Sequence, residues 1–169
     1  MDPVATAVAE PRPARDSDAG GLIALIGGCF AEYPGCVLDV DGEIPELNAI
    51  ASHVAARNGR FWVVEDGAGG IAASVGAVPR GDGAGVELIK LYVRADHRRR
   101  GLARRLIALV EAFARERGAS YIDLWSDTRF LEAHATYEKL GYLRLADTRV
   151  LADKSDTVEF HFLKHLGRR

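Results

Sequence analysis

The sequence has few cysteines, no long apolar run and almost no net charge. Its two cysteines, Cys29 and Cys36, have no second pair to complete a zinc site, and they are too few for the disulfide framework of a small secreted protein. No apolar stretch approaches the ~20 residues that a membrane-spanning helix needs, and the apolar run 4–9 lacks the basic lead-in of a signal peptide. These absences predict no metal ion, no membrane partner and a reduced, cytoplasmic compartment.

The charge balance leaves no overall positive field. The 22 Lys and Arg residues are offset by 24 Asp and Glu residues, for a formal net charge of −2. We therefore expect no nucleic-acid partner and only local anion binding. With 169 residues, 48% of them hydrophobic, the chain can form one globular domain with a buried core. We place this domain at 12–166, between a flexible N-terminal tail, 1–11, and a C-terminal tail, 167–169.

The first third of the domain is expected to hold an edge strand and two helices around an irregular connection. Prolines favour an edge strand at the start, and acidic residues after it can cap a helix. The connection that follows is acidic and contains Pro34, Gly35 and Gly42; a long connection of this kind is more often a binding loop than filler. The expected elements are a strand at 12–14, a helix that starts at 16–18, a loop at 32–43 and a helix at 45–57.

The rest of the chain alternates strand patterns with two helices, which predicts a mixed α/β fold. Asp66-Gly67 and Gly81-Asp82-Gly83 are hairpin signals, so the strands that they join should be antiparallel. The best helix of the chain has a strand on each side, and this strand–helix–strand unit predicts a parallel pair. The expected strands are 61–65, 70–78, 85–94, 121–125, 142–148 and 157–163, and the expected helices are 101–117 and 131–140.

The segment between the strand at 85–94 and the helix at 101–117 has the composition of an anion site. It reads Arg98-Arg99-Arg100-Gly101-Leu102-Ala103-Arg104. Glycine allows a tight backbone, and the unpaired amides and positive end of a helix suit a phosphate group. The small Ala103 lets a ligand approach, and the arginines add charge-assisted hydrogen bonds. The segment therefore predicts a ligand with phosphate groups.

Other interpretations of the arginines compete with a ligand site. A solvated basic face fits the composition equally well, although the position between strand and helix favours binding. A nucleic-acid patch would need interleaved aromatic residues for base stacking, and only Tyr92 lies nearby in the sequence. The lysine pattern of a P-loop is absent, so a nucleoside triphosphate is not the expected ligand.

These residues resemble the GNAT superfamily of acyl-CoA-dependent N-acyltransferases. The family's hallmark is Arg or Gln, two residues, Gly, one residue, then Gly or Ala, and Arg98, Gly101 and Ala103 match it. The preceding strand, 87–93, is similar to the family's central strand, and Tyr137-Glu138-Lys139-Leu140-Gly141-Tyr142 resembles its later tyrosine motif. The two motifs stand in the family's order, so their combination is more specific than the short hallmark.

The resemblance implies a fold and a donor. The fold is a mixed, mostly antiparallel central sheet with a parallel, splayed pair at its centre and about four flanking helices. The donor is acetyl-CoA, held without a metal: the central strand would bind its pantetheine arm, and the helix start its pyrophosphate. Where the family often has an asparagine, this chain has Asp127-Thr128-Arg129-Phe130. The implied donor-binding residues are Leu91, Tyr92, Val93, Arg98, Arg99, Arg100, Gly101, Leu102, Ala103, Arg104, Tyr137 and Lys139.

The implied activity is direct transfer of an acetyl group to a primary amine of a small molecule, an amino acid or a peptide. The attacking amine must be neutral, so a base has to remove its proton. Glu87 is the candidate base. On a regular strand it would share one face with Ile89, Leu91 and Val93, which places it in a cleft or at the exposed start of the strand.

Tyr137 is the stronger catalytic candidate, because similar tyrosines in the family lie near the thioester sulfur. It stands three residues after His134, so the two side chains share a helix face. The alternative is a core tyrosine whose hydroxyl has a local hydrogen-bond partner.

The acceptor site follows less directly from the sequence. Acidic residues at 32–43 could form a mouth for a cationic amine, or serve only solubility. Arg129 would instead suit an acceptor that carries a carboxylate. We expect the acceptor near Tyr33, Asp39, Asp41, Arg129 and His134.

The main alternative to an enzyme is a CoA-binding sensor or partner-binding module that has the same fold and transfers nothing. It predicts donor binding without turnover. Family members are often homodimers, and no pattern in this chain identifies an interface.

Overall fold

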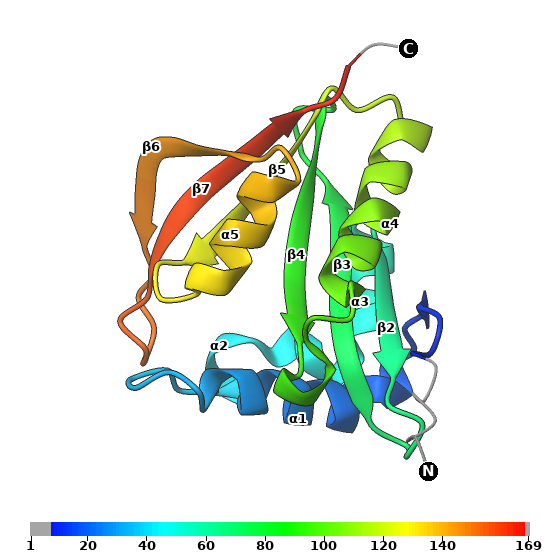
Figure 1. Cartoon of the computed structure of the whole chain (residues 1–169), viewed down its shortest axis with the longest axis vertical. Helices are drawn as coiled ribbons and strands as arrows, with labels where there is room; N and C mark the ends of the chain where they lie inside the picture. Colours follow the sequence, from blue (N-terminus) through cyan, green and yellow to red (C-terminus); the bar gives the residue numbers. More distant parts are fainter. Residues whose placement is uncertain (1–7, 168–169) are drawn as a thin grey trace.

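A seven-stranded sheet organises the computed structural model, which describes residues 8–167 (Figure 1). The strands follow the order β1-β2-β3-β4-β5-β7-β6, and neighbours are antiparallel except for the parallel pair β4 and β5. The predicted mixed, mostly antiparallel sheet is confirmed. The strands are β1 (Arg12–Pro13), β2 (Arg60–Glu65), β3 (Ile71–Pro79), β4 (Gly85–Val93), β5 (Tyr121–Asp127), β6 (Leu143–Val150) and β7 (Val158–His165).

Five α-helices and three short 3₁₀ helices occur in the described residues. One α-helix, α2, lies in the connection that was expected to be irregular, and Asp39 caps it by accepting a hydrogen bond from the Gly42 amide at 3.1 Å. The helix expected at 45–57 starts instead as a 3₁₀ helix at Pro45. The helices are η1 (Asp16–Asp18), α1 (Ala19–Phe30), α2 (Val40–Glu43), η2 (Pro45–Ala49), α3 (Ile50–Ala56), η3 (Ala95–His97), α4 (Leu102–Glu116) and α5 (Leu131–Lys139).

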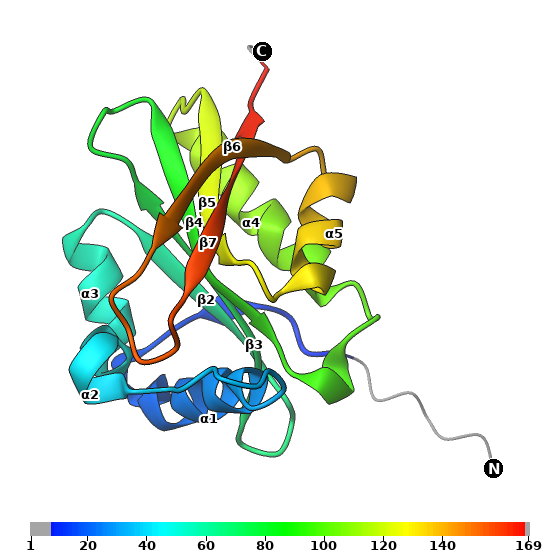
Figure 2. The ribbon, with the colours of Figure 1, turned by 90° about the vertical axis from the view of Figure 1, so that its left-hand side faces the viewer.

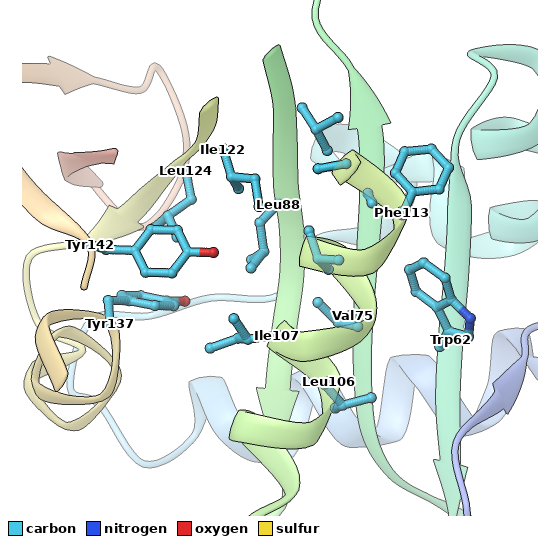
Figure 3. Close-up of a cluster of buried hydrophobic side chains, with 14 of the residues drawn as sticks. Trp62, Val75, Leu88, Leu106, Ile107, Phe113, Ile122, Leu124, Tyr137 and Tyr142 are labelled. Carbon is cyan, nitrogen blue, oxygen red and sulfur yellow. The ribbon is translucent and has the colours of Figure 1, made fainter. Parts of the chain in front are cut away.

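The helices cover both faces of the sheet (Figure 2). The larger hydrophobic core lies between the sheet and the helices α4 and α5, and Figure 3 shows Trp62 packed edge-on against Phe113, with ring centroids 6.3 Å apart. The smaller core, which includes Leu25 and Phe61, lies on the opposite face with α1 and α3. Within residues 8–167, no helix is both long enough and apolar enough to cross a membrane.

Part of the expected N-terminal tail contacts the domain. Val8 and Ala9 pack against the larger core, and Glu10 forms an ion pair with Arg105. The remainder of that tail, 1–7, and residues 168–169 of the expected C-terminal tail lie outside the described residues.

The helix α4 forms where apolar periodicity predicted the best helix of the chain. Its buried side chains recur at helical spacing and leave the arginines on the outer face. Leu106, at the centre of the buried stripe, is fully inaccessible to solvent. Packing of this stripe on β3, β4 and β5 fixes where the helix starts, and the N-terminus of α4 lies beside the end of β4 (Figure 1).

The parallel strands β4 and β5 separate after a short pairing. They are paired only from Gly85 with Tyr121 to Glu87 with Asp123. Beyond these residues β5 stays paired with β7 along its whole length, whereas β4 stays paired with β3. The predicted splayed pair is therefore present, and its opening exposes the backbone edges of the last parts of both strands.

A β-bulge lies in β4 beside this opening. Between the pairs Gly76–Ile89 and Ser74–Tyr92, β4 contains one residue more than β3. Lys90 takes up the extra length with a φ of 49°, and its carbonyl accepts a hydrogen bond from Ser74 Oγ at 2.9 Å. A bulge of this kind interrupts the alternation of side chains along a strand.

The bulge reverses the faces expected for the end of β4. Leu91 and Val93 pack against the larger core, whereas Ile89 and Tyr92 pack against the smaller one. The prediction that Glu87 shares a face with Leu91 and Val93 is therefore wrong. Glu87 lies with Ile89 and Tyr92 on the face that α1 covers, because the extra residue shifts the alternation by one position.

Candidate active site

A cavity of about 400 Å³ opens beside the splayed strands. It lies between the end of β4, the start of α4, the helix α5 and the end of α1. Of the donor-binding residues expected from the sequence, all but Arg100 and Tyr137 line it. The lining residues are Cys29, Tyr33, Leu91, Tyr92, Val93, His97, Arg98, Arg99, Gly101, Leu102, Ala103, Arg104, Phe130, Glu132, Ala133, Thr136 and Lys139.

The backbone at the start of α4 is rich in free hydrogen-bond donors. Arg99 and Gly101 have positive φ angles of 60° and 75°, which bend the chain into the helix. Within the described residues, none of the six amides from Arg99 to Arg104 has a backbone or side-chain acceptor. A row of unpaired amides at the positive end of a helix is suited to an anion. This fits the expected pyrophosphate site.

The arginines of this segment divide into two groups. Arg98, the first residue of the hallmark, is turned inward: its Nε donates to the Val93 carbonyl at 3.0 Å, and its Nη1 donates to Glu32 Oε1 at 2.8 Å. It therefore joins the end of α1 to the end of β4. By contrast Arg99 and Arg104 line the cavity without an ion-pair partner among residues 8–167, so their charges are available to a ligand.

One wall of the cavity comes from a stripe on α5 that the sequence analysis missed. Glu132, Ala133, Thr136 and Lys139 recur at spacings of three and four, so they share a helix face. This spacing could have revealed the stripe once the tyrosine motif had placed Lys139 at the donor. Cys29, His97 and Phe130 were also missed; they reach the cavity only through the packing of distant segments.

Tyr137 lies beneath this wall, in the larger core. Its ring packs 5.4 Å from Phe162 and 6.1 Å from Tyr142, between centroids. Figure 3 shows its hydroxyl directed toward Ile107 of α4 and Leu88 of β4, on the side of the splayed strands. Burial raises the pKa of Tyr137, so the hydroxyl stays protonated. The alternative of a hydroxyl with a local protein partner finds no support within residues 8–167, where the Tyr137 hydroxyl has no hydrogen bond.

Glu87 is held in a chain of charged groups at the point where β4 and β5 separate. Its carboxylate lies 3.1 Å from Arg80 Nη1, and the same guanidinium donates to Asp123 at 2.8 and 2.9 Å. Asp123 in turn lies 2.8 Å from Nε2 of His161. With 16% of its side chain exposed, Glu87 is not a solvated edge carboxylate.

The acidic residues proposed for an acceptor mouth do not meet at the cavity. Asp39 forms an ion pair with Lys154 at 2.6 Å, and Asp41 is exposed. Neither residue lines the cavity, whereas Tyr33, expected at the same site, does.

Arg129 and His134 are occupied by structural contacts. The guanidinium of Arg129 donates to both carboxylate oxygens of Asp127 at 2.9 Å and to the Ser155 carbonyl at 3.1 Å, which ties the end of β5 to the connection between β6 and β7. His134 is buried, and its Nε2 lies 3.1 Å from Ser126 Oγ. Burial lowers the pKa of His134, which favours its neutral form. Neither residue lines the cavity.

The parallel pair that separates beside a cavity defines the class of fold, and comparison with known proteins names the family. The model of the acetyltransferase (GNAT) family matches residues 22–142. The chain therefore belongs to the GNAT acetyltransferase family, whose members use an acyl-CoA donor.

Relatives and solved structures agree with this assignment. Human N-acetyltransferase 8 is 32% identical over 121 residues, which are 68% of this chain and 53% of that protein. A probable N-acetyltransferase family 8 member 5 from mouse is 31% identical over 127 residues, 73% of this chain and 53% of that protein. The chain thus spans about half the length of these relatives.

Among solved structures, a GNAT acetyltransferase from Staphylococcus aureus Mu50 superposes with a TM-score of 0.80 at 19% identity, covering 94% of this chain and 99% of that one. The yncA protein of Salmonella typhimurium, solved with its cofactor acetyl-CoA, superposes with a TM-score of 0.70 at 15% identity and covers 95% of both chains. These similarities support the fold. Within residues 8–167, no group of three or more His, Cys, Asp and Glu side chains is arranged to hold a metal ion.

Proposed function

We propose that this protein transfers the acetyl group of acetyl-CoA directly to the primary amine of a small molecule, an amino acid or a peptide. One observation carries the proposal: a single cavity joins the free amides at the start of α4 to the last residues of β4, which lie beyond its pairing with β5. A donor with phosphates at one end and a reactive acyl group at the other matches a cavity of this form. Membership of the acetyltransferase family supports the same donor.

The residues present fit acetyl-CoA. The amides from Arg99 to Arg104 would bind the pyrophosphate, and the side chains of Arg99, Arg104 and Lys139 would add positive charge. The pantetheine arm would lie between the end of β4 and the stripe on α5, where Ala133 leaves room for it. Backbone groups of β4 near Leu91 would orient the acyl carbonyl, since the β5 side of that edge is unpaired.

Bound acetyl-CoA supplies the thioester that the amine attacks. Glu87 lies on the α1 side of the splayed strands, with its carboxylate 3.1 Å from Arg80 Nη1. An ionised carboxylate there would accept the proton of the incoming amine, directly or through a water molecule. Tyr137 lies on the opposite side, and its protonated hydroxyl would donate a hydrogen bond to the leaving sulfur.

The proposal is tested by calorimetry with acetyl-CoA together with an assay of CoA release in the presence of primary amines. We expect micromolar binding, transfer to at least one amine, and a rate that rises with pH as the amine loses its proton. Binding without transfer to any amine, peptide or amino acid would favour a CoA sensor with the same fold. Absence of binding by the folded protein would contradict the donor site.

A further inference from the structure

The end of the cavity beside α1 is walled by aromatic rings. Tyr33 and Phe130 both line the cavity, and their ring centroids lie 4.9 Å apart. Behind them Phe30 lies 6.4 Å from Phe130 and 6.0 Å from Tyr92, which also lines the cavity. Three separate segments therefore contribute to one aromatic wall, namely the end of α1 with the turn after it, β4, and the turn before α5: Phe30, Tyr33, Tyr92 and Phe130.

This wall lies at the end of the cavity where an acceptor would meet the acyl group. The phosphate end is set by Arg99 to Arg104, and the acyl end by the backbone near Leu91. Cys29 Sγ lies 3.7 Å from the Val93 carbonyl, so the end of α1 adjoins the end of β4. Figure 1 shows α1 passing below the lower ends of β4 and α5, next to the opening. A group held by the aromatic wall would thus lie beside the thioester.

The acidic groups around this wall are nearly all neutralised. Glu32 pairs with Arg98, and Asp127 pairs with Arg129. On the sheet face nearby, Glu159 pairs with Arg149 at 2.7 Å, Glu46 with Lys90 at 3.0 Å and Glu87 with Arg80 at 3.1 Å. A ligand with several positive charges would find few free carboxylates here.

Glu132 is the one acidic side chain among the described residues that line the cavity. It is exposed at the start of α5, and it has no ion-pair partner within residues 8–167. Glu132 follows Phe130 by two residues and lines the same cavity as Tyr33, so it lies near the aromatic wall. One free carboxylate beside aromatic rings suits one ammonium group, because both the charge and the ring faces attract it.

From this arrangement we infer the class of acceptor, on the basis of the proposed acetyl transfer: a primary amine with a single positive charge, carried on an aromatic or similarly flat apolar body. Glu132 receives the ammonium, and Tyr33, Tyr92 and Phe130 hold the body. Polycationic acceptors are disfavoured. The fold alone does not decide this, since solved structures that share it include aminoglycoside 6'-acetyltransferases, at 18–21% identity.

The test compares kcat/KM for four amines in the CoA-release assay: phenylethylamine, propylamine, spermidine and the aminoglycoside kanamycin. We expect phenylethylamine to exceed propylamine by about tenfold or more, since a buried ring adds apolar contact, and to exceed both polycations. Phe130→Leu should remove most of the preference for phenylethylamine. Glu132→Gln should raise the KM for phenylethylamine, whereas Glu138→Gln, an exposed acid on the same helix outside the cavity, should not.

The outcomes separate this inference from the proposed function. Equal kcat/KM for phenylethylamine and propylamine, or a preference for spermidine or kanamycin, overturns the inference while acetyl transfer stands. A preference that survives Phe130→Leu and Glu132→Gln also overturns it. Transfer to none of the amines by a protein that binds acetyl-CoA overturns both. Calorimetry with acetyl-CoA on each variant verifies that the donor site is intact.

Discussion

Gly101 offers a direct test of where the donor's phosphates lie. Its φ of 75° lies in the left-handed region, and a Cβ added there would have no neighbour within 4 Å. A short side chain at this position would therefore extend into the space beside the free amides. Among residues other than glycine, Asn and Asp adopt this backbone region most readily. We accordingly compare Gly101→Asp with Gly101→Asn, which have almost the same size and differ in charge.

The magnitude follows from the repulsion between one carboxylate and the pyrophosphate. Two unit charges about 4 Å apart repel by about 1 kcal/mol in water and by about 4 kcal/mol at an effective dielectric constant of about 20. Gly101 is exposed, which places the site between these limits. The Kd for acetyl-CoA should thus be roughly 5- to 900-fold higher for the Asp variant than for the Asn variant.

Calorimetry measures both dissociation constants, and thermal unfolding verifies that the two variants are equally stable. The difference between them should shrink as salt is added, because the groups are open to solvent. Equal affinity of the Asp and Asn variants at low salt would refute the reasoning, since it would mean that no phosphate approaches Gly101.

Three other residues yield predictions that use different measurements. Tyr137→Phe should lower kcat strongly while the Kd for acetyl-CoA stays unchanged, because the variant lacks the hydroxyl proposed to donate to the leaving sulfur and keeps the ring in the core; unchanged turnover in the CoA-release assay would exclude Tyr137 from the reaction. Leu106→Ala should lower the free energy of unfolding by about 2–5 kcal/mol in urea titrations, since the side chain is fully buried between α4 and the sheet. A loss below about 1 kcal/mol would mean that the core closes around the space left by the missing side chain. Burial lowers the pKa of His134 in the folded protein, so the fold favours the neutral imidazole. The resulting contribution to stability is complete above the ordinary pKa of about 6.5 and is lost as the pH falls through the lowered pKa of the folded state. The Tm should therefore fall more between about pH 7 and pH 5 for the natural protein than for His134→Gln, and parallel curves would contradict a buried, neutral His134.

The proposed donor half of the site was predictable because its signals are local. Consecutive residues reveal the start of the helix, its glycine and the small side chain next to it. The free amides from Arg99 to Arg104 then follow from helix geometry. The strand–helix–strand unit around α4 likewise predicted the parallel pair, since a crossover connection of this length returns the chain in the same direction. Even so, Arg98 was expected to bind the donor, and its guanidinium is bonded to Glu32 and Val93.

Of the residues proposed for the acceptor half, the sequence indicated Tyr33 but not Phe130 or Glu132, because residues of this half are far apart in the sequence. Tyr33 and Phe130 meet only when α1 packs beside the start of α5. Arg129 was predicted to contact the acceptor from its charge alone. Its guanidinium instead donates a hydrogen bond to the carbonyl of Ser155, which lies in the later connection between β6 and β7. Side-chain type indicates what a residue can bind, but the partner that it finds depends on which segments the fold brings together.

The sequence by itself determined the order of most helices and strands, the family and the position of the helix start proposed to bind phosphate, because the patterns behind each are short runs of neighbouring residues. Only the tertiary structure decided which face of β4 each side chain occupies, since the extra residue at Lys90 shows in the pairing with β3 and not in the apolar pattern. It also decided which charges remain free. Ion pairs such as Glu32 with Arg98 form between segments that packing brings together, whereas Glu132, the one acid in the described lining of the cavity, has no ion-pair partner within residues 8–167.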